Sequence, residues 1–191
     1  MRKLGVLVGF LPLIVYAILS GDTLQSQEIA LLSAAVISLV AGFRTLKRGF
    51  YLDWANLLMF AGALFCIAVL NITVIADYMT IIIYLVLALV AFGSLLAGVP
   101  FTIQYARDMV DKSRWDHPVF KSLNRFMTGV WGSLFVINLA LVTYAKYGSG
   151  PFAPVAGMGI YAVLVLGLAF TVLYPAYLQK QQQALPVQGQ A

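Results

Sequence analysis

The sequence is poor in charge, cysteine and histidine, and each shortage excludes a class of protein. Only 10% of the 191 residues are charged, whereas soluble domains carry about 25%, so the chain cannot cover a water-facing surface. The single cysteine, Cys66, excludes an internal disulfide, and its apolar neighbours favour a small buried side chain. The single histidine, His117, excludes a haem held by two histidines of one chain.

The motifs of common catalytic sites are also missing. No apolar segment contains a cluster of metal-binding side chains or a histidine that could serve a serine nucleophile. No glycine-rich phosphate loop precedes a Lys-Ser or Lys-Thr pair. Asp116 and His117 are interpreted as a helix-capping pair rather than metal ligands. We therefore expect no catalytic activity, no cofactor and no metal site.

What the chain has instead is long apolar segments, and 62% of its residues are apolar. Crossing the hydrocarbon layer takes roughly 20 such residues in a helix. The segments of this kind are Leu4–Ser20, Ile29–Phe43, Trp54–Ile75, Thr80–Val99, Phe126–Tyr147 and Phe152–Tyr174. They predict an all-α integral membrane protein with six transmembrane helices. The second segment is the shortest, and we expect it to extend through Gln25–Gln27 or to thin the bilayer locally.

The basic residues are distributed asymmetrically over the connections. Eleven of the twelve fall on one side of the predicted membrane, and Lys146 is the exception. The eleven are Arg2, Lys3, Arg44, Lys47, Arg48, Arg107, Lys112, Arg114, Lys121, Arg125 and Lys180. The positive-inside rule makes this side cytoplasmic, with both termini on it. The net charge of +5 is then explained by topology and lipid headgroups, and we expect no nucleic-acid partner.

The predicted organisation is a single membrane domain over residues 1–178, followed by a disordered cytoplasmic tail, 179–191, that is rich in glutamine. The connections on the opposite face are short and are expected to join antiparallel helices. They are Gly21–Glu28, Ala76–Met79 and Gly148–Pro154.

The longest polar connection, 100–125, lies between the fourth and fifth segments. Phe101, Tyr105 and Met109 recur every fourth residue and would line one face of a helix. Opposite charges spaced at i and i+4 would stabilise that helix. These pairs are Arg107–Asp111 and Asp108–Lys112.

A second short helix is predicted from Pro118, with Asp116 or His117 near its N-cap. Residues 100–125 would then form two amphipathic helices on the inner membrane surface. Such a segment can be a lipid-bound connection, a docking surface for a cytoplasmic partner, or the gate of a transport path, and the sequence does not separate these. Candidate contact residues are Arg107, Lys112, Arg114, Trp115, His117, Phe120 and Arg125.

Inside the apolar segments, asparagine is the most polar side chain. Asn56, Asn71 and Asn138 either bond neighbouring helices together or line a path for a small solute. No segment carries a charge near its centre, which disfavours ion-coupled pumping. Glycine and alanine residues in the segments permit close helix packing and equally support a homodimer.

Three short stretches resemble the bacterial septation protein A family, also called inner membrane-spanning protein. They are Phe10–Tyr16 (FLPLIVY), Met79–Tyr84 (MTIIIY), and Leu123-Asn124 followed by Trp131, Phe135 and Asn138. The approach to the fourth segment differs, because Asp77-Tyr78-Met79-Thr80 stands where the family has Lys-Trp-Lys-Pro. The resemblance implies a multi-pass protein of the bacterial inner membrane that supports cell-envelope maintenance or septation. It also implies contacts with lipids and with envelope or division proteins.

Overall fold

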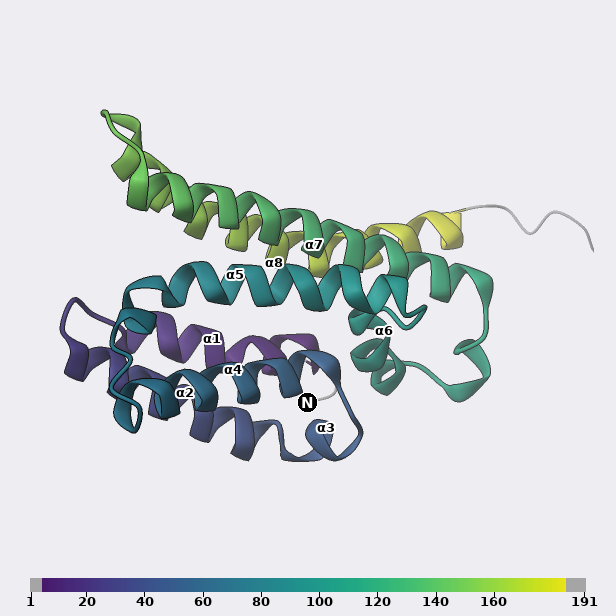
Figure 1. Ribbon diagram of the computed structural model, residues 1–191. Coiled ribbons are helices and arrows are strands. Elements are labelled where there is room, and N and C mark those ends of the chain that lie inside the picture. The colour runs from purple at the N-terminus through teal and green to yellow at the C-terminus, as the bar shows by residue number, and fades with distance from the viewer. Residues whose placement is uncertain (1–4, 185–191) are drawn as a thin grey trace, which may run out of the picture. The chain divides into compact units, whose positions relative to one another are not determined.

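The computed structural model describes residues 5–184, and their side chains except for residues 5–7, 154 and 176–184. Every regular element in this range is helical (Figure 1). The α-helices are α1 (Gly5–Leu19), α2 (Leu24–Ala41), α3 (Phe43–Lys47), α4 (Tyr51–Ala68), α5 (Val74–Leu96), α6 (Phe101–Ala106), α7 (Pro118–Tyr147) and α8 (Phe152–Ala184). Two single 3₁₀ turns, η2 (Arg107–Met109) and η3 (Lys112–Arg114), lie between α6 and α7. The predicted all-α class is confirmed.

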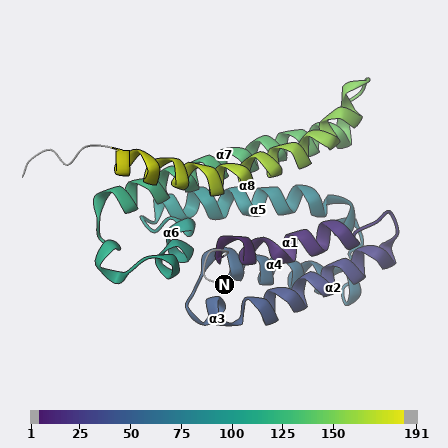
Figure 2. The same cartoon turned by 180° about the vertical axis from the view of Figure 1, so that it is seen from behind.

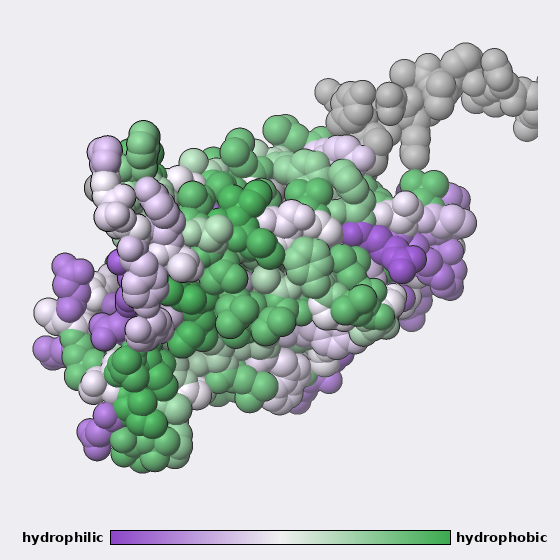
Figure 3. Space-filling view, turned by 45° about the horizontal axis from the view of Figure 1, so that its top comes forward, coloured by the Kyte–Doolittle hydropathy of each residue, from purple (hydrophilic) through white to green (hydrophobic). Residues whose placement is uncertain are grey.

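The helices are those of a membrane-embedded protein. Five of them, α2, α4, α5, α7 and α8, are long and apolar enough to cross a membrane. Large apolar side chains on their surfaces face outward, including Leu58, Leu89 and Leu96. On the face seen in Figure 3, hydrophobic residues cover most of the surface. The first predicted segment, Leu4–Ser20, corresponds to α1, which has 15 residues and is shorter than the other five helices.

One predicted helix boundary is confirmed by the structure, and another is wrong. α2 begins at Leu24, so the predicted extension through Gln25–Gln27 is confirmed, and Thr23 caps it by accepting a bond from the Ser26 amide at 3.2 Å. The turn predicted at Ala76–Met79 is wrong, because α4 already ends at Ala68 and α5 begins at Val74. Asn71 makes the turn with φ of 56°, a left-handed conformation that asparagine tolerates better than most residues.

Backbone packing divides the chain into two compact units, Met1–Leu139 and Ala140–Ala191, where the sequence predicts one domain over 1–178. In the first unit, α1 packs against α2, α2 against α4, and α4 against α5 (Figures 1 and 2). Aromatic contacts fill the interior, since the Phe10 ring stacks on Trp131 at 4.8 Å and Tyr16 lies 5.5 Å from Phe60. Removing one such buried ring costs about 3–5 kcal/mol.

The second unit contains the last residues of α7 together with α8. Here the Leu141 side chain lies 3.5 Å from where a side chain on Gly159 would begin, so the glycine permits close packing of the two helices. α8 continues to Ala184, so the start of the predicted disordered tail, 179–184, is helical instead. Glutamine, lysine and alanine are good helix formers, which explains the extension. Residues 185–191, like Arg2 and Lys3, lie outside the described residues.

Candidate functional site

The α3–α4 connection and α6 meet at one end of the first unit, and we call residues 45–53 with 101–108 the α3/α6 junction. α4 begins after Phe50, whose side chain cannot cap a helix. The missing acceptor comes from a distant residue, since the Gln104 side-chain oxygen accepts from the Tyr51 amide at 3.0 Å. The Gln104 side-chain amide also donates to the Gly49 carbonyl at 3.3 Å. The start of α4 therefore depends on α6.

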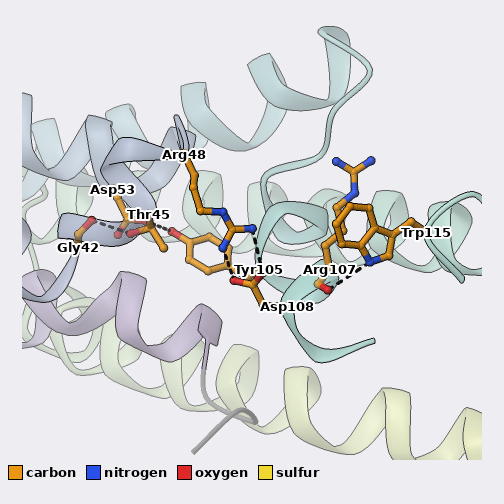
Figure 4. A network of polar contacts seen from close by, with 8 residues as sticks. All are labelled: Gly42, Thr45, Arg48, Asp53, Tyr105, Arg107, Asp108 and Trp115. Carbon is orange, nitrogen blue, oxygen red and sulfur yellow. Dashed lines mark hydrogen bonds and ion pairs between the residues drawn. The ribbon is translucent and has the colours of Figure 1, made fainter. Parts of the chain in front are cut away.

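A buried carboxyl group lies at the centre of the junction. Asp53 is 4% exposed and accepts a hydrogen bond of 2.7 Å from the hydroxyl of Tyr105, which is itself buried (Figure 4). The Thr45 hydroxyl, which donates to the Gly42 carbonyl at 2.8 Å, lies beside the same carboxyl group. Burial, followed by the charge of Asp53 and the bond to it, raises the pKa of Tyr105, so the tyrosine stays protonated and acts as a donor at neutral pH.

α1 packs closely against the hydrogen-bonded pair of Tyr105 and Asp53. A side chain added at Gly9 would begin 2.7 Å from the Tyr105 hydroxyl oxygen, so any larger residue would force the tyrosine to shift. One turn beyond Asp53, the Asn56 amide nitrogen donates to the Gly9 carbonyl at 2.8 Å. α1, α4 and α6 are thus joined by polar bonds in a buried setting, where each is strengthened by the low dielectric.

An ion pair closes the exposed edge of the junction. Arg48 contacts both carboxylate oxygens of Asp108 at 2.7 and 2.8 Å, the two-point geometry that arginine favours. The guanidinium also lies 4.6 Å from the Phe50 ring centre. The hydrogen bond to Asp108 and its negative charge raise the pKa of Arg48 above its usual value. Both side chains are nearly half exposed, so solvent screening keeps the pair weak.

This pairing overturns the predicted charge pattern of 100–125. The α-helix ends at Ala106, so the i,i+4 pairs Arg107–Asp111 and Asp108–Lys112 do not form, and Asp108 turns to Arg48 instead. The predicted apolar stripe is only partly right, because Phe101 and Tyr105 are buried while Met109 is 42% exposed. The segment is not a pair of helices lying on a surface. α6 is packed against α1 and α5, and the second predicted helix is the beginning of the 30-residue α7.

The candidate contact residues form no single cluster. Lys112, Arg114, His117 and Arg125 are exposed, whereas Arg107, Trp115 and Phe120 are half-buried. Trp115 folds back, with its indole nitrogen donating to the Arg107 carbonyl at 3.2 Å and its ring 5.2 Å from that guanidinium (Figure 4).

The start of α7 follows the predicted capping pattern. Pro118 is its first residue, and the His117 ring nitrogen accepts from the Val119 amide at 3.3 Å. Lys121 pairs with the exposed carboxylate of Asp116 at 2.8 Å. Its hydrogen bond and charge hold the pKa of Asp116 below the usual value.

The three candidate asparagines are not brought together in one path. Asn71 lies exposed in the turn between α4 and α5 rather than inside a helix. Asn138 is fully buried in α7, and neither polar atom of its side chain has a hydrogen-bond partner. Asn56 is satisfied on its nitrogen, but its side-chain oxygen is also buried without a partner.

Asp53 and Gln104 are functional positions that the sequence did not predict, and Tyr105 was predicted only as an apolar position of a helix. Their partners lie about fifty residues away, a separation at which local spacing carries no signal. One local sign was available, because α4 begins after Gly49-Phe50 without a serine, threonine, aspartate or asparagine to cap it.

Among the described residues, no group of three histidine, cysteine, aspartate or glutamate side chains is placed to hold a metal ion. Comparisons with protein-family models, with curated proteins and with solved structures find no match. The arrangement of charged and exposed side chains is therefore the ground for a functional proposal.

Proposed function

We propose that this chain is a six-span protein of the bacterial inner membrane, with cytoplasmic termini, that supports cell-envelope maintenance or septation by binding a protein partner and without catalysis. The observation that carries the proposal is the exposed segment 107–117, which is held at both ends. Asp108 is bonded to Arg48, and His117 caps α7. The envelope role itself comes from the resemblance of Phe10–Tyr16 and Met79–Tyr84 to septation protein A.

The contact between Arg48 and Asp108 supports the proposed orientation. It joins two basic connections, 44–48 and 107–125, that the positive-inside rule assigns to the cytoplasm. α4 leads away from these connections to the Asn71 turn, and α5 leads back to α6. The two basic connections therefore share one end of the unit, as the proposed topology requires.

The charges of 107–117 suit a protein partner. The segment contains three basic residues, Arg107, Lys112 and Arg114, and three acidic residues, Asp108, Asp111 and Asp116. Asp108 and Asp116 are paired with Arg48 and Lys121 outside the segment. The charges of both signs give register and specificity against a protein with the complementary pattern. Because the segment is anchored, little ordering is needed on binding.

Photo-crosslinking in the cell tests this proposal. A photoreactive residue at Arg114, which is exposed, should give discrete adducts with an envelope or division protein. Position Ile72, exposed in the turn at the other end of α4, is the matched control and should give none of these adducts. Identical adducts from both positions, or adducts with lipid alone from Arg114, would contradict the proposal.

A second function, a facilitator of small polar solutes, is favoured by one observation. The buried Asn138 amide has no protein partner for either polar atom, and such a group normally bonds to water or to a ligand. Purified protein in liposomes should then pass a small polar solute such as glycerol faster than Asn138→Leu protein. Equal rates for both proteins and for protein-free liposomes would exclude this function for that solute.

A further inference from the structure

The surface around α3 differs in character from segment 107–117. α3 has five residues and connects α2 to α4, both of which are long and apolar enough to cross a membrane. Only Gly42 separates α3 from α2, and residues 48–50 separate it from α4. With so little chain on either side, α3 lies where the two helices leave the hydrocarbon layer, at the level of the lipid headgroups.

The charge that this surface presents is positive. Arg44 and Lys47 are exposed, and neither has an ion-pair partner among the side chains that the structure describes. The one acidic residue between positions 43 and 54, Asp53, is buried against Tyr105 and offers no exposed charge. Arg48 is the only basic residue of α3 and its connections that is already neutralised, by Asp108.

Exposed aromatic residues lie on α3 and on the first turn of α4, close in sequence to these two basic side chains. Phe43, Tyr51 and Trp54 are all exposed, by 52%, 39% and 44%. The Lys47 ammonium lies 4.4 Å from the centre of the Phe43 ring, and the Trp54 indole nitrogen donates to the Leu46 carbonyl at 2.9 Å. Tyr51 and Trp54 each have one polar edge, and such side chains prefer the headgroup level. Arg44 and Lys47, which are close to them in sequence, then lie at the depth of the lipid phosphates.

We propose that these five residues bind the headgroup of an anionic phospholipid of the surrounding bilayer. They are Phe43, Arg44, Lys47, Tyr51 and Trp54, and we call them the α3 surface. Arg44 and Lys47 pair with the phosphate oxygens, and the rings contact the glycerol and upper acyl chains. The inference rests on the membrane placement in the proposed function, but not on the protein partner.

Fluorescence quenching in bilayers tests the assignment. The full chain, with Trp115→Phe, is reconstituted in phosphatidylcholine containing a small fraction of either phosphatidylglycerol or phosphatidylcholine that carries a shallow quenching group. Trp54 is then the exposed reporter, because Trp131 is only 1% exposed. The ratio of the two quenching efficiencies measures the preference of the α3 surface for the anionic lipid.

The wild-type surface should prefer the anionic quencher, and raising the salt concentration should weaken that preference. Arg44→Gln with Lys47→Gln should lower it by up to about 25-fold, since each juxtamembrane basic residue contributes about 1 kcal/mol, or about fivefold. Lys112→Gln with Arg114→Gln is the matched control, because it removes the same charge from segment 107–117, which is not part of the α3 surface, and it should leave the preference unchanged.

Two results would overturn the inference: an unchanged preference in the Arg44/Lys47 variant, or an equal loss in the control. Circular dichroism in the same vesicles checks that each variant retains its helices, and the single substitutions replace the pair if it does not insert. A failure to find a protein partner at Arg114 leaves this readout intact, so the two proposals can fail independently.

Discussion

The two ends of α4 are held in different ways. Around its start, the backbone amide of Tyr51 and the side chains of Arg48, Asp53 and Asn56 bond to residues 47 to 60 positions away. At its far end, the Asn71 turn is closed by short-range backbone bonds, such as Ile72 to Cys66 at 2.9 Å.

The neighbouring α1–α2 connection is equally local. The Gln27 side chain accepts from the Tyr16 hydroxyl and donates to the Gly21 carbonyl, both at 2.7 Å and both within 11 residues along the chain. One end of the unit is thus assembled from distant segments and the other from neighbouring ones. A perturbation at the α3/α6 junction should therefore spread between segments, whereas one at the far end should stay local.

The largest effect is expected from the buried tyrosine of the junction. Tyr105→Ala removes a ring that is 2% exposed and leaves Asp53 without its donor, so unfolding in detergent should become easier by about 3–5 kcal/mol. Tyr105→Phe keeps the ring and loses only the bond to a charged group, which costs about 1.5–3 kcal/mol. Chemical denaturation followed by circular dichroism measures both. Equal effects of the two variants would show that the bond, not the ring, dominates.

The same tyrosine predicts an alkaline loss of stability. Its pKa is raised in the folded state by burial and by Asp53, so the folded chain holds its proton more tightly than the unfolded chain. Stability is then fully present below the ordinary tyrosine pKa of about 10 and falls above it, by about 1.4 kcal/mol per pH unit. Tyr105→Phe should remove this contribution. A parallel pH dependence of the two proteins between pH 9 and 11 would contradict the expected coupling.

The features that could be predicted from the sequence are the local ones, and those that depend on distant residues could not be predicted. Hydropathy located the six helical segments, the length needed for a span predicted the extended start of α2, and the capping pattern placed the start of α7, because these depend on neighbouring residues. The junction was not predictable, because Gln104 caps a helix whose start is more than fifty residues earlier in the chain. The prediction of i,i+4 pairs at Asp108 failed for the same reason, since a distant arginine competes for the carboxylate.

Substitutions of two glutamines allow a direct comparison of the α3/α6 junction with the α1–α2 connection. Gln104→Ala removes the cap of α4, and Gln27→Ala removes two bonds of the α1–α2 connection, so each should cost about 1 kcal/mol. Hydrogen exchange should separate them. Gln104→Ala is expected to speed exchange in both 49–53 and 101–108, whereas Gln27→Ala should speed it only in 16–27. If exchange becomes faster in only one of 49–53 and 101–108 in the Gln104 variant, the two segments are not coupled through this side chain.

The smallest effect is expected at the exposed edge of the junction. Arg48→Gln removes the ion pair with Asp108, and because both side chains are nearly half exposed the loss should be about 1 kcal/mol or less and smaller still at high salt. Lys121→Gln is the matched control, since its pair with Asp116 joins residues five apart on one segment. Exchange in 101–108 should quicken only in the Arg48 variant, because only that pair connects distant segments. If the two variants alter exchange in the same way, the ion pair adds nothing to the coupling, and α4 is joined to α6 by the bonds of Tyr105 to Asp53 and of Gln104 to the Tyr51 amide.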